Sequence, residues 1–390
     1  MSASLSKVAA IVGIGHTDYA ADHKTVLGGT KPHNALGYTA IGFTRALADA
    51  GIERDEIDGL MVSFGTPYER VSEILGLNVK WGVSNDPMMG MQEAVSAIAA
   101  GRCEVVALVY GTEQRSAGMN YGGTNPVGGA GFLNLVFHAP WGFTSQGALY
   151  AIQFQRYMWE RGYTHSDLGQ IAVAQRHAAS LNPDAIMRKP VTIEDYLASP
   201  WVVEPLHRLD YCLINDGGVS LILMSAERAE RAAKKSGKKP VYIHGIGRYD
   251  LNRKASSLEP RFDGYYAPAE EAAGHQAFEM AGVGPKDMDC LQIYDSFSPH
   301  VMMALEGYGY CADGDVAKFF RETGIGLGGG LPINTSGGHL SESYMQGWGH
   351  QVEAVRQIRG ECGERQVPDC DFVHMSSDVA GKAVSIIYGK

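Results

Sequence analysis

The sequence has no basic surplus, no paired cysteine motif and no long apolar run, and each absence excludes a class of protein. Its 390 residues carry 33 Lys and Arg against 43 Asp and Glu, so no basic stripe is available to hold nucleic acid. No apolar segment approaches the length of a membrane span, and the apolar run 8–14 lacks the charged leader of a signal peptide. We therefore expect a cytoplasmic globular protein that binds neither nucleic acid nor a membrane, with a first strand at 8–14.

The six cysteines are scattered along the chain. Because no two of them form a Cys-x-x-Cys pair, their spacing predicts neither a zinc site nor a redox pair. We expect reduced thiols and no metal. The cysteines are Cys103, Cys212, Cys290, Cys311, Cys362 and Cys370.

An internal duplication is visible without gaps. Segment 50–60 aligns with segment 281–291, and Ile11-Val12-Gly13-Ile14-Gly15 aligns with Ile243-His244-Gly245-Ile246-Gly247. In each copy a helical stretch ends at a glycine and a short acidic connection leads into a strand. The pattern predicts two similar α/β halves, 1–235 and 236–390, each a sheet with helices on its faces.

The Gly-x-Gly at Gly13 and Gly15 also resembles the start of a dinucleotide-binding loop. The third glycine of that motif is missing, because Asp18 occupies its place, so we expect no nucleotide cofactor.

An insertion at about 113–210 separates two strands of the first half. It opens with a glycine-rich stretch at 121–131 and continues with helical patterns at 145–161 and 166–181. It is interpreted as a loop domain, and a flexible surface excursion remains the alternative.

Two short sequence motifs, called frames below, contain the candidate catalytic residues. The first is Asn334-Thr335-Ser336-Gly337-Gly338, followed six residues after its second glycine by Tyr344; the second is Tyr294-Asp295-Ser296-Phe297-Ser298. They resemble two active-site frames of thiolases, in which a histidine and an asparagine hold the places of Tyr344 and Tyr294.

The two cysteines that the resemblance would require are absent. The segments that match the thiolase cysteine sites, 82–92 and 374–381, contain none. Since the thiolate is the nucleophile that takes the acyl group in a thiolase, acyl-cysteine chemistry is not expected.

With phenols at both positions, the chain resembles the lipid-transfer-protein aldolases of the thiolase superfamily, which act in bacterial steroid side-chain degradation. The resemblance covers nearly the whole chain, including the Asp-Gly element at 212–218. It implies a thiolase fold, an α/β protein in which two duplicated halves form an α-β-α-β-α core with the loop domain over the active site. It also implies retro-aldol cleavage of a β-hydroxyacyl-CoA to a ketone or aldehyde and a shortened acyl-CoA such as propionyl-CoA.

The same resemblance implies partners: a homodimer, and a small acyl-CoA-binding protein with an OB fold and a zinc-ribbon segment. No cofactor is expected beyond the CoA thioester substrate. The net charge of −10 fits poorly with binding a polyanionic CoA alone, so a partner that supplies part of the CoA site is consistent with the sequence.

Retro-aldol cleavage needs a proton acceptor and an enolate site but no acyl-enzyme. We expect Tyr344 to handle the β-hydroxyl proton and Tyr294 to protonate or support the enolate. A phenol has an unperturbed pKa near 10, so a helper is needed, and histidine suits this role better than a carboxylate. The helper candidates in the frames are Asp295, His339, Glu342 and His350, with His374 as a weaker one, and the expected substrate-binding residues are Gly337, Gly338 and Ser84.

Other interpretations remain open. Each phenol could be structural, with one hydrogen bond in the core. The chain could be an acyltransferase that uses Ser84 as nucleophile, or a catalytically silent acyl-CoA-binding scaffold.

Overall fold

The computed structural model describes residues 4–63, 66–119, 141, 145–251, 263–378 and 382–390. Its main strands, in chain order, are β1 Ala9–His16, β2 Gly59–Ser63, β3 Trp81–Asn85, β4 Val105–Glu113, β7 Asp216–Ser225, β8 Val241–Asp250, β9 Cys290–Ile293, β10 Phe372–Ser377 and β11 Lys382–Gly389. Its helices are α1 Tyr19–Leu27, α2 Ala35–Ala50, α3 Tyr68–Leu75, α4 Pro87–Ala99, α6 Gln146–Arg161, α7 His165–Ser180, α8 Ile193–Leu197, α9 Ala226–Ser236, α10 Ala267–Ala281, α11 Pro299–Gly307, α12 Val316–Glu322, α13 Gly338–Ser341 and α14 Trp348–Arg359.

The strand order repeats between the two halves. It runs β3-β2-β4-β7-β1 and then β8-β11-β10-β9. In the first half β2 and β4 are parallel, while β4, β7 and β1 pair antiparallel. In the second half β9 and β10 are parallel, while β10, β11 and β8 pair antiparallel. The predicted duplication is therefore confirmed, and in the described part of the sheet the halves meet where β1 pairs with β8 over two residue pairs.

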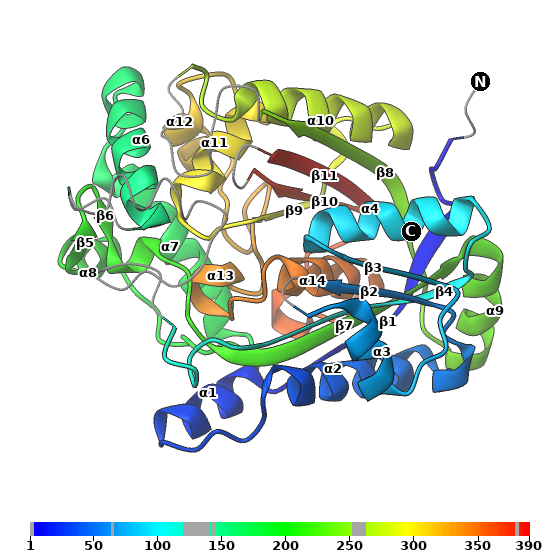
Figure 1. Cartoon of the computed structure of the whole chain (residues 1–390). Coiled ribbons are helices and arrows are strands. Elements are labelled where there is room, and N and C mark those ends of the chain that lie inside the picture. The colour runs from blue at the N-terminus through cyan, green and yellow to red at the C-terminus, as the bar shows by residue number, and fades with distance from the viewer. Residues whose placement is uncertain (1–3, 64–65, 120–140, 142–144, 252–262, 379–381) are drawn as a thin grey trace.

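Helices form three layers around the strands (Figure 1). Helices α4 and α14 lie in the middle and contact strands of both halves, while α2 and α10 cover the outer faces of the first and second half. Strand β4 reads as an apolar run whose first six residues are all buried, as expected for a strand covered on both faces. This arrangement is the expected α-β-α-β-α core.

The Gly-x-Gly pairs are explained by helix packing. A Cβ added at Gly13 would lie 2.3 Å from the Ala46 carbonyl oxygen of α2, and one at Gly245 would lie 2.0 Å from the Ala277 carbonyl oxygen of α10. In both halves the glycines let a helix backbone approach the strand closely. This repeated contact gives the motif a structural role.

The insertion carries α6, α7, α8 and a small hairpin of β5 (Trp201–Val203) and β6 (Leu206–His207). Both predicted helices are present. Apolar residues of α6 and α7 join those of α11 in one core cluster, so this part of the insertion is packed against the second half. The predicted glycine-rich stretch at 121–131 lies outside the described residues. Among the helices that the structure describes, none is both long and apolar enough for a membrane span.

Candidate active site

The two phenols from the predicted frames meet. Tyr294 directly follows β9 and Tyr344 follows α13, and their hydroxyl oxygens are 2.9 Å apart in a hydrogen bond that either could donate. The backbone N–H of Tyr294 donates to the Ser376 carbonyl of β10 at 2.9 Å, and that of Tyr344 donates to Asn215 Oδ1 at 2.7 Å. Both tyrosines are thus held by their backbones, and residues from both halves converge here.

Burial raises the pKa of both phenols well above the ordinary value near 10. Their hydrogen bond lowers the pKa of Tyr294 and raises that of Tyr344. The thiol of Cys212 is near enough to raise both phenol pKa values further, and burial raises its own pKa to about 12. At neutral pH the two hydroxyls and the thiol therefore keep their protons.

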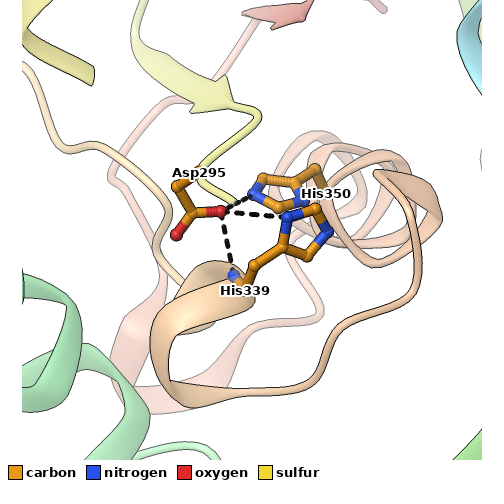
Figure 2. Close-up of side chains that lie close together, drawn as sticks. All are labelled: Asp295, His339 and His350. Carbon is orange, nitrogen blue, oxygen red and sulfur yellow. Dashed lines mark hydrogen bonds and ion pairs between the residues drawn. The ribbon is translucent and has the colours of Figure 1, made fainter. Parts of the chain in front are cut away.

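Asp295, the residue after Tyr294, is a carboxylate that faces His339 and His350 (Figure 2). Asp295 Oδ1 accepts from the backbone N–H of His339 at 2.9 Å and lies 2.9 Å from His350 Nε2, and its Oδ2 accepts from the N–H of Leu340 at 3.4 Å. The ring of His339 contacts both phenol rings edge-on or tilted, with centroids 4.7 Å from Tyr294 and 4.8 Å from Tyr344. The structure thus brings these three predicted residues together with both tyrosines.

Both ring nitrogens of His339 face other groups of this cluster. The N–H of Gly347 donates to His339 Nε2 at 3.0 Å, so the proton of the neutral ring is on Nδ1, which faces Asp295 Oδ1 at 3.4 Å. Burial lowers the pKa of His339 well below its ordinary value, and the neighbouring histidines lower it further, which favours this neutral form. Asp295, His339 and His350 have ligand atoms close enough to hold a metal ion, but His339 could ligate through Nδ1 only as an imidazolate. The cluster is better suited to fixing the loop than to binding a metal.

Local backbone geometry explains the Asn-x-x-Gly-Gly frame. Asn334 has a φ of +50°, and its side-chain amide accepts from the N–H of Ile293 at 2.8 Å and donates to the Ile293 carbonyl at 2.9 Å. Gly338 has a φ of +57°, and a Cβ there would lie 2.4 Å from Asp295 Oδ2. At Gly337 a Cβ would lie 2.7 Å from Ala179 of α7. These residues fix the segments that carry the two phenols, and the substrate-binding role of Gly337 and Gly338 stays a prediction.

Three other candidates lie outside the phenol cluster. His374 sits on β10 between Tyr310 and Ser385, whose oxygens are 2.7 and 2.8 Å from its ring nitrogens, and burial lowers its pKa to about 3. Ser84, on β3, is exposed and donates to the Thr66 carbonyl at 3.3 Å. Glu342 accepts from Asn182 and Ser336 and so connects the active-site loop to the segment that follows α7. None of these contacts reaches either phenol.

At the start of α4, the place that matches the thiolase cysteine site, the chain has a capping carboxylate and no cysteine. Asp86 caps this helix, and its carboxylate accepts from the N–H of Met88 at 3.1 Å. A helix start lowers a thiol pKa through its free N–H groups, whereas here a carboxylate takes one of them. No thiolate could be activated there in the same way.

Several residues near the phenols were not among the predicted site residues. Cys212 belongs to the segment before β7, while Ser296, His300 and Asp378 form a hydrogen-bonded chain close to Tyr294. Ser296 lies inside the second frame, before α11, and His300 lies four residues later, in the first turn of that helix. Asp378 is distant in sequence, so only the pairing of β9 with β10 reveals the chain.

A cavity of about 600 Å³ lies between α10 and α11, and its lining does not include the phenols. Its lining includes Glu271, His275, Phe278 and Glu306, and none of the predicted site residues. It is therefore not the site of the predicted chemistry.

Comparisons with known proteins agree with the geometry. Residues 254–390 match the family model described as Thiolase C-terminal domain-like. The chain is 32% identical over 372 residues to a "Steroid side-chain-cleaving aldolase" of Thermomonospora curvata, covering 91% of each chain. It is 34% identical over 373 residues to a "17-hydroxy-3-oxo-4-pregnene-20-carboxyl-CoA lyase" of Mycobacterium tuberculosis, covering 91% of this chain and 92% of that one.

A solved structure described as "Ltp2-ChsH2(DUF35) aldolase" superposes with a TM-score of 0.87 at 30% identity, covering 99% of this chain and 98% of the other. Sequence and structural similarity therefore extend over nearly the whole molecule.

Proposed function

The chain belongs to the thiolase superfamily, in its branch of steroid side-chain-cleaving acyl-CoA aldolases, and from that premise we propose that its substrate is a steroid side-chain CoA thioester with a β-hydroxyl group. One observation carries the chemistry: the hydrogen-bonded pair of neutral phenols, Tyr294 and Tyr344, stands where the superfamily's acyl-transfer enzymes carry other groups. Such a pair can donate to and protonate an oxyanion or enolate, but it offers no nucleophile for acyl transfer.

The substrate of the mycobacterial relative shows what this reaction would produce. In 17-hydroxy-3-oxo-4-pregnene-20-carboxyl-CoA the hydroxyl at C17 is β to the thioester. Breaking the C17–C20 bond leaves a ketone at C17 and a three-carbon acyl-CoA, propionyl-CoA. No oxidation or reduction occurs, because the hydroxyl proton is in effect transferred to C20.

The two phenols have separate roles in this proposal. Tyr344 hydrogen-bonds the β-oxygen and Tyr294 donates to the thioester oxygen, on which negative charge develops as the carbon-carbon bond breaks. Raised pKa values suit this role, because a phenol that is protonated at neutral pH can donate to the charge that develops in the reaction. The Asp295, His339 and His350 cluster keeps both rings in place.

Product analysis tests this function. The enzyme is incubated with 17-hydroxy-3-oxo-4-pregnene-20-carboxyl-CoA, and separately with a β-ketoacyl-CoA plus free CoA. We expect a 17-ketone and propionyl-CoA from the first and no thiolysis of the second. Thiolysis, or acylation of Ser84, would favour the acyltransferase alternative, while binding without turnover of either would favour the scaffold. Cleavage of a non-steroidal β-hydroxyacyl-CoA in preference to the steroid would retain the reaction and overturn the substrate assignment.

The assembly is also a proposal. We infer a homodimer that includes β3, because this strand is at one end of the strand order and its residues are only partly buried. Strand β9, at the other end, is fully buried, and Ile333 forms a bridge with its Leu291. One sheet edge is thus covered within the chain, whereas no described strand pairs with the outer edge of β3, which supports pairing there with a second copy.

A small DUF35-type protein with an OB fold and a zinc-ribbon segment is the proposed second partner, located with the enzyme in the cytoplasm. The similarity to the solved Ltp2-ChsH2(DUF35) aldolase supports it, and the net charge of −10 is consistent with a CoA site completed by another chain. The test measures the mass of the purified chain, and its cleavage rate with and without such a protein. A fully active monomer with tight CoA-ester binding would contradict both parts.

A further inference from the structure

A second histidine-carboxylate unit lies beside Tyr294. His300, in the first turn of α11, has its Nδ1 hydrogen-bonded to Asp378 Oδ1, and its Nε2 lies 3.2 Å from Ser296 Oγ. All three side chains are buried, and His300 is fully so. The ring of His300 packs 4.3 Å from the ring of Tyr150 and edge-on to that of Tyr294, at 6.3 Å between centroids.

The contacts determine the direction of the hydrogen bonds. Because a carboxylate accepts, the proton of the neutral His300 ring is on Nδ1, and Nε2 accepts from the Ser296 hydroxyl. In the described part of the chain Ser296 Oγ has no other hydrogen-bond partner, so its oxygen can still accept a proton from a bound group. Ser296, His300 and Asp378 therefore form a relay that can take up a proton at Ser296 and store it on His300, next to a carboxylate that stabilises the resulting cation.

A second carboxyl group lies at the inner end of the relay. Glu270 of α10 is completely buried beside Asp378, and neither of its carboxyl oxygens has a hydrogen-bond partner among the described residues. Burial, and then the Asp378 carboxylate, raise the pKa of Glu270 well above its ordinary value, so Glu270 is protonated and adds no second negative charge next to Asp378.

The cluster at Asp295 is less suited to accept a proton. Both ring nitrogens of His339 are directed at Gly347 and Asp295, and Nε2 of His350 faces Asp295 as well, which leaves His350 Nδ1 without a described partner. The phenols keep their protons. A base for the β-hydroxyl proton is therefore needed next to the phenol pair, and Ser296 offers an acceptor there that is already hydrogen-bonded to a histidine and, through it, to a carboxylate.

We propose that Ser296, His300 and Asp378 form the proton relay of the retro-aldol reaction, in which Ser296 contacts the substrate β-oxygen. This inference rests on the proposed function. The β-hydroxyl proton passes to Ser296 Oγ as the Ser296 proton passes to His300 Nε2, and a carbonyl forms at the β-carbon. The electrons of the broken carbon-carbon bond remain on the thioester enolate, which takes a proton from Tyr294. The proton stored on His300 then restores Tyr294, so no co-reactant is required.

Two relay variants and one matched control test the proposal. Ser296→Ala removes the outer hydroxyl without touching the His300–Asp378 contact, and His300→Ala removes the proton store. The control is His244→Ala, another buried histidine, on β8, whose Nε2 lies 3.2 Å from the Lys390 carbonyl oxygen. Each enzyme, with any partner that the wild type requires, is assayed with 17-hydroxy-3-oxo-4-pregnene-20-carboxyl-CoA. Binding is measured with 3-oxo-4-pregnene-20-carboxyl-CoA, which lacks the β-hydroxyl.

We expect kcat to fall about 10²–10⁴-fold in both relay variants, the usual range for a lost acid-base group, while the deoxy compound binds within about threefold of wild type. Added imidazole should partly restore His300→Ala, and the control should keep wild-type kcat. If wild type cleaves the substrate and either relay variant retains most of kcat, the relay is wrong while the proposed function stands. Equal losses in the relay variants and the control would also refute it, because they would show a general packing effect. If wild type does not cleave the substrate, the proposed function itself fails.

Discussion

Removing the two phenol hydroxyls singly and together should show that they act as one unit. Tyr294→Phe and Tyr344→Phe each delete one end of a single 2.9 Å hydrogen bond. Each change should lower kcat about 10²–10⁴-fold, which corresponds to about 2.7–5.4 kcal/mol of transition-state stabilisation. Because the two hydroxyls are hydrogen-bonded to each other, loss of either also disturbs the position of the other, so the double variant should be no more than about tenfold slower than the slower single variant.

The stability of the variants follows separate reasoning. Each single change leaves the other hydroxyl, in a site from which water is largely excluded, without its partner. This should cost roughly 1 kcal/mol of unfolding free energy. In the double variant neither hydroxyl is left without its partner. Its loss of unfolding free energy should therefore be smaller than the sum of the losses in the two single variants.

Steady-state cleavage assays and urea unfolding are carried out on the wild type, the two single variants and the double variant, which together form a double-mutant cycle. The measured quantity is the coupling between the two positions in log kcat and in unfolding free energy. If the fold-loss in kcat of the double variant equals the product of the two single fold-losses, the phenols do not act as one unit. Independent groups would lower kcat about 10⁴-fold or more in the double variant. Wild-type rates in both single variants would make the phenols structural.

Three further predictions concern neighbouring residues. Cys212→Ala and thiol alkylation should leave most activity, and mass spectrometry of quenched enzyme should find no acylated cysteine, because burial raises the thiol pKa to about 12; an acyl adduct on Cys212 would contradict the mechanism. Burial raises the pKa of Glu342 from an ordinary 4.5 to about 7, so the folded protein retains a proton that the unfolded chain loses, and stability should fall as pH rises through that window. Glu342→Gln should therefore gain stability relative to wild type between pH 4.5 and 7, by up to about 3 kcal/mol, and a difference that does not change with pH in urea unfolding would contradict this. Gly338→Ala combines a φ of +57° with a Cβ 2.4 Å from Asp295 Oδ2, so it should cost roughly 1–3 kcal/mol and most activity, and wild-type values of both would show that the loop adapts.

The fold, and the presence of both phenols in one site, could be predicted from the sequence. The duplicated segments and the glycines at Gly13 and Gly245 are local signals, and each is explained by contacts between one strand and its own helix. Tyr294 and Tyr344 were found because each sits in a frame whose spacing is preserved. His300, the histidine proposed to store the proton, was harder to identify from the sequence, since its neighbours depend on strand pairing.

His300 and His374 illustrate that limit. In sequence both are single histidines near the second half's strands, and nothing local distinguishes them. In the structure His374, on β10, bonds to Tyr310 and Ser385, whereas His300 meets Asp378 only because β10 ends beside β9. Chemical roles that depend on such long-range pairing are not visible in spacing.

The backbone supports of the phenol loops have a consequence for classifying other proteins. Asn334 and Asp295 shape these segments through hydrogen bonds to backbone groups, and none of these bonds involves the side chain at position 294 or 344. A change at either position can therefore alter the reaction while the surrounding chain keeps its conformation. Chains that share the Asn-x-x-Gly-Gly frame should accordingly be sorted by the residues at these two places before overall identity is considered, because a relative with high identity but histidine at 344 would perform different chemistry on the same scaffold.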